Sequence, residues 1–396
     1  MRPNRFSLPR RAVAEFVLPG HPDKLGDAVA ARLVDFMRQA SGSSQCGVEV
    51  ACVFDQVVLT GRVASRDAAA LQALRDGRYW ELTRAAYASA GYGEDAAGHV
   101  WGPRPEDLQV TSLLRVGEFD EGERELRHLS DDQAICVGYA CRSPATDWLP
   151  PAHWLARRIG HELVRLRAEQ GAGQLGPDGK VLVYGAGELA AFRPTLVSLS
   201  LHHHERSDWL LLRRIAEEAV ETACAGLPTP GIELNGAGMF VCGGPNGDNG
   251  LSGKKLVVDA YGPGVPIGGG AWSGKDLWKV DRLGGLAARR LALDSLHASD
   301  ADEALVTLSY LPGGDRPARV DLLLDGVASD AVMIPDELGA LESDRMHGLF
   351  VKADASLVEL ARWGHQQPGL PWELPWQAGV PGSPRRSAAR SRQAGT

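Results

Sequence analysis

The sequence lacks the features that define several large classes of protein. It has no run of apolar residues long enough to span a bilayer. Its basic start, MRPNRFSLPRRAVAEF, lacks the apolar segment and cleavage pattern of a secretory signal peptide. The formal net charge of −8 at pH 7 argues against a general nucleic-acid-binding protein. We therefore expect a cytoplasmic protein with neither a membrane nor a nucleic acid as its partner.

Cysteine patterns that build zinc sites or redox pairs are also missing. The cysteines form no C-x-x-C pair, and their spacing fits no zinc site. We interpret them as reduced thiols, mostly buried, which agrees with a cytoplasmic location. They are Cys46, Cys52, Cys136, Cys141, Cys224 and Cys242.

The chain has 396 residues, which is enough for two or three domains with sizeable cores. A pattern of paired strands followed by helices repeats three times, and this favours an α+β fold of three related subdomains. Strands are expected at 48–63, 108–116, 134–140, 180–184, 195–203, 255–259, 304–310 and 319–324. Helices are expected at 22–38, 67–87, 150–170, 208–225, 276–297 and 356–363.

One stretch, Phe240 to Arg282, is crowded with glycines that alternate with lysines and aspartates. Glycine lets the backbone approach a ligand closely, lysine supplies a point charge for phosphate, and aspartate can hold Mg²⁺. The stretch therefore predicts a polyphosphate and metal site. The alternative is a set of glycine turns with solvated lysines. A Walker A loop is excluded because Asp276 stands where that motif needs Ser or Thr.

Two segments of the stretch, GGPNGDNGLSGKKLVVDAYG and GGGAWSGKDLWKVDR, resemble the C-terminal signature of the S-adenosylmethionine synthetases, or methionine adenosyltransferases. A second signature, GHPDK, lies far upstream at Gly20 to Lys24, in the order that the family shows. The resemblance spans about residues 15–376. It implies three similar subdomains, each a mixed or antiparallel sheet with helices on one face. We place them at 12–125, 129–241 and 242–376, before a basic tail at 377–396 that we expect to be disordered.

The resemblance also implies an activity. The family transfers the adenosyl group of ATP to the sulfur of L-methionine, which gives S-adenosylmethionine, phosphate and diphosphate. Mg²⁺ and K⁺ are the implied cofactors. A homodimer or a dimer of dimers is the implied assembly, with the active site between subunits.

The catalytic and metal positions of the family are present in this chain. His21 matches the histidine near the leaving triphosphate oxygen, although a capping role at the start of a helix is the alternative. Asp23 and Asp281 match the carboxylates that hold Mg²⁺. Glu49 stands at the position of the K⁺ glutamate, although it also fits an outward residue of a strand. The catalytic lysines are Lys180, Lys275 and Lys279.

The resemblance also assigns substrate contacts. Asp248 and Lys279 are expected to face methionine, and Arg62 stands where the family has a glutamate that recognises the methionine ammonium. Phe240 matches an aromatic residue near adenine, with a place in the core as the alternative. The contacts implied for ATP and its triphosphate are His21, Asp132, Lys180, Phe240, Asp248, Lys254, Lys255 and Lys275.

Departures from the family pattern gather at the methionine positions. Arg62 has the wrong charge for an ammonium group, and the family's Gln-Ser-Pro-Asp segment is not recognisable. Two alternatives to a working synthetase therefore stay open. One is a relative that adenosylates another nucleophile, or that only hydrolyses ATP or triphosphate. The other is a non-catalytic relative that binds nucleotide and regulates a true synthetase.

Overall fold

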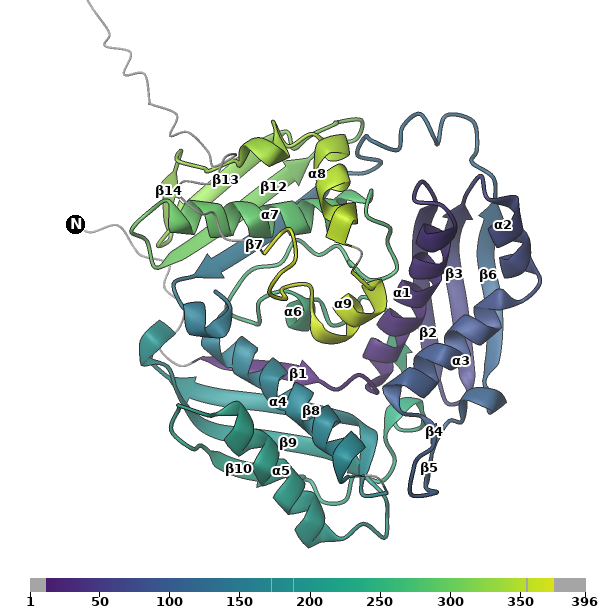
Figure 1. The fold of residues 1–396 in the computed structure, drawn as a ribbon, viewed down its shortest axis with the longest axis vertical. Helices are drawn as coiled ribbons and strands as arrows, with labels where there is room; N and C mark the ends of the chain where they lie inside the picture. Colours follow the sequence, from purple (N-terminus) through teal and green to yellow (C-terminus); the bar gives the residue numbers. More distant parts are fainter. Residues whose placement is uncertain (1–11, 172, 188, 354, 374–396) are drawn as a thin grey trace, which may run out of the picture.

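The structure is a computed structural model that describes residues 12–171, 173–187, 189–353 and 355–373. The predicted basic tail at 377–396 lies outside these residues. The three four-stranded sheets of the described chain stand around a common centre, and helices cover one face of each (Figure 1). The α+β prediction with three similar subdomains is confirmed.

The first sheet has the strand order β11-β2-β3-β6. Its strands are β2 (Gln45–Val53), β3 (Gln56–Ala64), β6 (Gln109–Gly117) and the short β11 (Gly250–Leu251). Burial alternates along β2, so one face packs under the helices while the other stays open. The helices that cover this sheet are α1 (Pro22–Ala40), α2 (Ala68–Arg75) and α3 (Arg78–Ala90).

The second sheet has the order β1-β8-β9-β10 and the third has the order β14-β13-β12-β7. The second contains β1 (Val13–Val17), β8 (Leu175–Ala186), β9 (Arg193–His203) and β10 (Gly231–Leu234), covered by α4 (Pro151–Glu169) and α5 (Trp209–Ala223). The third contains β7 (Ala134–Cys141), β12 (Glu303–Tyr310), β13 (Arg319–Leu324) and β14 (Val327–Ser329), under α7 (Val280–His297). The other elements are β4 (Gly93–Glu94), β5 (Val100–Trp101), α6 (Leu256–Asp259), α8 (Ser343–Phe350) and α9 (Leu357–Trp363).

Each sheet takes one strand from a distant part of the chain. The N-terminal β1 pairs with β8, β7 pairs with β12, and β11 pairs with β2. The predicted boundaries at 12–125, 129–241 and 242–376 therefore describe each sheet only in part. Periodicity reveals that a segment is a strand, but it does not reveal the partner of that strand.

Two predicted elements differ from the structure. The single helix expected at 67–87 is two helices, because Gly77 takes a φ of 101° that breaks the helical path. The strand expected at 255–259 is the one-turn helix α6. Its two valines favour a strand, but tertiary contacts override such a weak local preference.

No helix of the described chain combines the length and the apolar character that a bilayer-spanning segment needs. All six cysteines are free thiols; five are buried and Cys242 is exposed. The prediction that most of the cysteines are buried is therefore confirmed.

Candidate active site

The glycine-rich stretch lies along one edge of strand β2. Leu251 pairs with Ala51 at one point of this edge, and Lys275 forms a β-bridge with Gly47 further along it. Four residues of a strand separate Gly47 from Ala51, which is about 13 Å. The stretch contains two Gly-Lys pairs, Gly253-Lys254 and Gly274-Lys275. The edge of β2 fixes them at two separate places.

His21 caps the N-terminus of α1 and faces a pocket. Its Nδ1 accepts a hydrogen bond from the Asp23 amide at 3.2 Å, and the residue is only 3% exposed. Burial lowers the pKa of His21 to about 3; Asp23 opposes this shift, and Lys180 and Lys255 add to it. The imidazole is therefore neutral at pH 7, and its proton lies on Nε2 because Nδ1 is an acceptor. His21 is thus both a helix cap and a hydrogen-bond donor.

Asp23 is a buried carboxylate surrounded by donors. Lys255 Nζ lies 2.8 Å from its Oδ2, Lys254 Nζ lies 3.6 Å from its Oδ1, and the Leu251 amide donates to Oδ1 at 3.0 Å. Burial raises the pKa of Asp23, but the hydrogen bonds from Lys255 and Leu251 outweigh it, so the net shift is downward. The carboxylate stays ionised and holds both lysines beside His21.

A cavity of about 350 Å³ lies beside these residues. His21 lines this cavity, and so does Lys180 of β8, which belongs to the second sheet. Gly244, in the loop that forms the far wall, donates its amide to the buried Asp178 at 2.8 Å. Phe240 and Asp248 also line the cavity. The structure thus assembles a first group of predicted residues: His21, Asp23, Lys180, Phe240, Asp248, Lys254 and Lys255.

A second group lies at the N-terminus of α7. Lys275 forms an ion pair with Asp281 in the first turn of this helix, and Lys279 forms one with Asp131. A Cβ on Gly270 would come within 2.1 Å of the Asp281 carboxylate, so only glycine lets the loop approach it. Asp132, the predicted ATP contact, instead accepts a hydrogen bond from its own neighbour Gln133. Asp131, which the sequence reasoning did not single out, is therefore the residue of this loop that contacts the second group.

The two groups stay separate in the described chain. No hydrogen bond or ion pair of the described residues joins the first group to the second. These residues also contain no cluster of three or more His, Cys, Asp or Glu side chains that could hold a metal ion. Asp23 and Asp281, the predicted Mg²⁺ ligands, belong to different groups.

Glu49 and Arg62 lie outside both groups. Glu49 is exposed on the open face of β2. Arg62, on β3, donates to Glu123 at 2.9 Å and to the Glu118 carbonyl at 2.6 Å, and it lies 3.7 Å from Asp120. Arg62 therefore holds the acidic segment 117–125 against the sheet. The predicted methionine contact is engaged by this chain's own carboxylates.

Sequence reasoning also missed a buried ion cluster behind the first group. Lys24 is 2% exposed, and its ammonium donates to Asp27 at 3.2 Å and to Asp259 of α6. Burial lowers the pKa of Lys24, but the two carboxylates outweigh this and raise it. The cluster ties α1 to α6 and so fixes the direction in which His21 points. A charged residue on the apolar face of a helix was the available signal.

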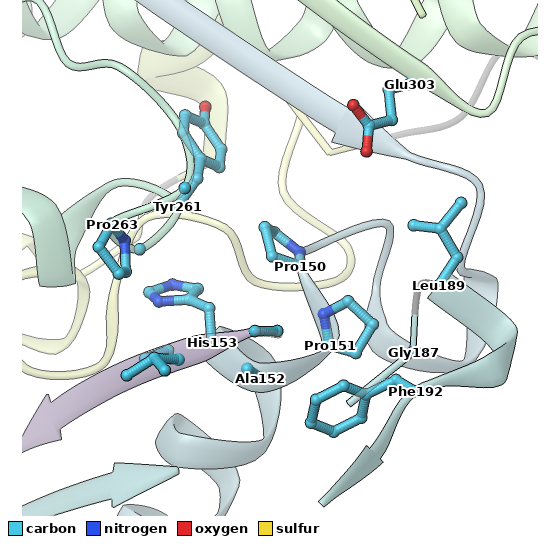
Figure 2. A pocket seen from close by; sticks show the side chains of 15 residues that line it. Pro150, Pro151, Ala152, His153, Gly187, Leu189, Phe192, Tyr261, Pro263 and Glu303 are labelled. Carbon is cyan, nitrogen blue, oxygen red and sulfur yellow. The ribbon is translucent and has the colours of Figure 1, made fainter. Parts of the chain in front are cut away.

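An apolar cavity of about 270 Å³ lies between the second and third sheets (Figure 2). Pro150, Pro151 and Phe192 form much of its wall, and burial lowers the pKa of the lining His153 to about 3. Among the described residues of its lining there is one carboxyl side chain, Glu303, and no lysine or arginine. None of the predicted site residues lines this cavity, and it does not fit a polyphosphate.

The buried histidines make the stability of the protein depend on pH. Burial lowers the pKa of four of them to about 3 or 4 in the folded state, from 6.5 in the unfolded chain. The unfolded chain therefore binds more protons between pH 3 and 6.5, and stability falls as pH drops through this range. Each histidine costs about 2 kcal/mol between pH 7 and 5. They are His21, His153, His202 and His347. Burial also lowers the pKa of His365 well below 6.5.

Two carboxyl groups act in the opposite direction. Burial raises the pKa of Asp27 and of Asp178 to about 6, so each of them stabilises the fold by about 1 kcal/mol over the same pH step. The histidine contribution is larger, so we expect urea unfolding at pH 5 to give a clearly lower free energy of unfolding than at pH 7. An equal or higher value at pH 5 would show that the histidines are not held neutral.

Comparisons with known proteins agree with this geometry. A family model described as the C-terminal domain of S-adenosylmethionine synthetase matches residues 242–335. The S-adenosylmethionine synthase of Gluconacetobacter diazotrophicus is 34% identical over 337 residues, which covers 80% of this chain and 80% of that protein. The S-adenosylmethionine synthase of Deinococcus radiodurans is 32% identical and covers 93% of this chain and 96% of its own.

A solved structure shows the same arrangement. It is described as an unusual S-adenosylmethionine synthetase from Campylobacter jejuni, and it superimposes with a TM-score of 0.78 at 27% identity. The match covers 92% of this chain and 96% of that one. The described chain is thus a three-sheet α+β protein with a pocket at a helix N-terminus, where Lys180 lines the pocket and two further lysines pair with Asp23. It belongs to the S-adenosylmethionine synthetase family.

Proposed function

We propose that the protein is a methionine adenosyltransferase, which transfers the adenosyl group of ATP to the sulfur of L-methionine. The products are S-adenosylmethionine, phosphate and diphosphate. The observation that carries the proposal is the first group: a neutral, buried histidine and Lys180 line one pocket, and Asp23 holds Lys254 and Lys255 beside that histidine. Membership of the family supports the choice of methionine as the acceptor.

In the proposed reaction, the methionine sulfur attacks C5′ of ATP, and the bond from C5′ to the triphosphate oxygen breaks. Negative charge then develops on the leaving oxygen. The Nε2–H of His21 is the donor for this oxygen, since Nδ1 is occupied by the Asp23 amide. Lys180 and Lys255 supply fixed positive charge beside it. Phe240, in the wall of the pocket, offers an aromatic face to the adenine.

The carboxylates present fit Mg²⁺ in the manner usual at nucleotide sites. Mg²⁺ there binds one or two carboxylates together with phosphate oxygens, rather than a cage made only of protein. Asp23 is ionised and lies beside the phosphate-binding lysines. Asp23 and Asp281 would hold the ion, which would supply charge neutralisation on the triphosphate. Glu49 would hold K⁺ from the open face of β2.

We propose that a second copy of the chain completes the site. The open face of each sheet carries a large exposed apolar residue: Leu113 on β6, Ile135 on β7 and Tyr184 on β8, at 66%, 55% and 39% exposure. Such residues on three open faces are typical of an interface. Packing two copies through these faces would bring the first group of one copy to the second group of the other.

Methionine recognition is proposed to use Asp248 and Lys279. Arg62 does not take the place of the family glutamate, because the acidic segment neutralises it.

Arg62 instead positions segment 117–125. We therefore expect Arg62→Ala to release this segment and to raise its rate of proteolytic cleavage several-fold, because the segment loses the cation that pairs with Glu123 and Asp120. Limited proteolysis with mass spectrometry measures the rate, and Arg78→Ala, an exposed ion-paired arginine elsewhere, is the matched control.

An unchanged cleavage rate in Arg62→Ala would contradict the positioning role of Arg62. Steady-state kinetics on the same variants would show whether the segment matters for methionine. A rise in the KM for methionine in Arg62→Ala but not in Arg78→Ala is the expected result.

Mass spectrometry of the products tests the proposed function. The wild-type protein is incubated with ATP, Mg²⁺, K⁺ and methionine, and a sample without methionine serves as control. S-adenosylmethionine with phosphate and diphosphate is the expected result. Consumption of ATP without this product would favour another nucleophile or simple hydrolysis. No consumption at all would favour a nucleotide-binding regulatory protein.

A further inference from the structure

His203 ends strand β9 directly behind the pocket of the first group. Its side chain is buried at 2% exposure. The loop from Asn235 to Gly244 forms one wall of the pocket, and Phe240 stands in the middle of that loop. His203 is the residue of β9 that contacts the backbone of this wall at Phe240.

Two hydrogen bonds join His203 to Phe240. The His203 amide donates to the Phe240 carbonyl at 3.0 Å, and the Phe240 amide donates to Nε2 of His203 at 3.0 Å. Both backbone groups of Phe240 are therefore satisfied by one residue. The position of the Phe240 backbone therefore depends on this imidazole, and the Phe240 ring itself packs against His202, with ring centroids 5.6 Å apart.

The other ring nitrogen fixes the tautomer. Nδ1 of His203 lies 2.9 Å from the His204 carbonyl, which is only an acceptor, so Nδ1 carries the proton. Nε2 is then free of a proton and can accept from Phe240. Only the neutral Nδ1–H form satisfies both contacts, and an imidazolium would place two N–H donors against each other.

The surroundings support a fixed ring. The indole of Trp209 packs edge-on against His203, with ring centroids 5.9 Å apart. Asn235, at the start of the loop, makes two hydrogen bonds with Leu201 of β9. Its Oδ1 accepts from the Leu201 amide at 2.7 Å, and its Nδ2 donates to the Leu201 carbonyl at 3.0 Å. The loop is therefore attached to β9 at two points, first through Asn235 and then through His203.

We propose that His203, as the Nδ1–H tautomer, is a positioning residue that sets the adenine-binding wall of the pocket through Phe240. The inference rests on the proposed function, since it assumes that this wall contacts the nucleotide. His203 itself does not line the pocket and does not touch the substrate.

Two variants that differ in reach test the proposal. In His203→Gln the amide oxygen reaches the place of Nε2 and can accept from the Phe240 amide. In His203→Asn the shorter amide replaces only the Nδ1 contact, and the Phe240 amide loses its acceptor. We expect His203→Asn to raise the KM for ATP about tenfold with kcat changed much less. His203→Gln should stay near the wild-type values.

The KM for methionine is the internal control, because the wall is proposed to contact only the adenine side. Equal KM values for ATP in the Asn and Gln variants, whether both normal or both raised, would overturn the positioning role. Failure of the wild-type protein to form S-adenosylmethionine would instead contradict the proposed function. The two failures are therefore distinguishable in one set of assays.

Discussion

Replacement of Asp281 by Asn, or of Lys275 by Ala, should reduce the formation of S-adenosylmethionine by a factor of about 1,000 or more. The two side chains form an ion pair at the start of α7, in the second group. Of the two proposed Mg²⁺ ligands, Asp281 is the one in that group, and Lys275 is proposed to supply a fixed positive charge for the triphosphate. Each substitution removes stabilisation of the transition state, in which the charge of the leaving group is largest.

The chain offers a matched control for the charge change. Lys352→Ala removes an exposed lysine that lies outside both groups, and it should leave kcat/KM near the wild-type value. Steady-state rates with saturating ATP and Mg²⁺ measure all three variants. Thermal unfolding shows whether the inactive ones are folded. A folded Asp281→Asn or Lys275→Ala protein with near-normal turnover would remove the second group from the active site.

Replacement of His21 by Asn should lower kcat by a factor of about 100 to 10,000. Asn is a good helix cap, so its side-chain oxygen can still accept from the Asp23 amide and α1 keeps its N-terminus. The shorter amide does not reach the place of the imidazole Nε2, so the leaving oxygen loses its donor. The substitution thus separates the capping role of His21 from the proposed chemical role.

His21→Ala is the comparison, because it removes the cap as well as the donor. It should be about 1 kcal/mol less stable than His21→Asn and equally inactive. Urea unfolding and initial rates on both variants measure the two effects. Normal activity in His21→Asn would show that His21 is only a helix cap, which is the alternative that the sequence leaves open.

Much of the first group could be predicted from the sequence because its residues are held by local geometry. GHPDK places a histidine and an aspartate at the start of a helix, and the glycine-rich stretch places lysines beside strand ends. The chain has seven lysines against 35 arginines, and six of the seven lie in the site or directly behind it. The small number of lysines is a further indication of the site. Because lysine and arginine are not interchangeable, the few lysines of an arginine-rich chain indicate positions that require lysine.

The remaining features depend on contacts between distant segments. The exchange of β1, β7 and β11 between sheets leaves no trace in periodicity. The ion pair of Asp131, rather than of its neighbour Asp132, with Lys279 depends on the path of one loop. The contacts of Arg62 depend on carboxylate partners that lie far along the chain. A sequence pattern predicts the strand or helix to which a residue belongs. It does not predict which distant residues or strands that residue will contact, and the features above depend on those contacts.

Subunit complementation between the two groups tests most directly that two chains build each site. His21→Asn is defective in the first group and Asp281→Asn in the second, and each homodimer should be nearly inactive. In a heterodimer purified through two different tags, one site carries both substitutions and the other carries neither. The heterodimer should therefore regain about half of the wild-type activity. A purified heterodimer as inactive as its parents would show that a single chain builds the whole site.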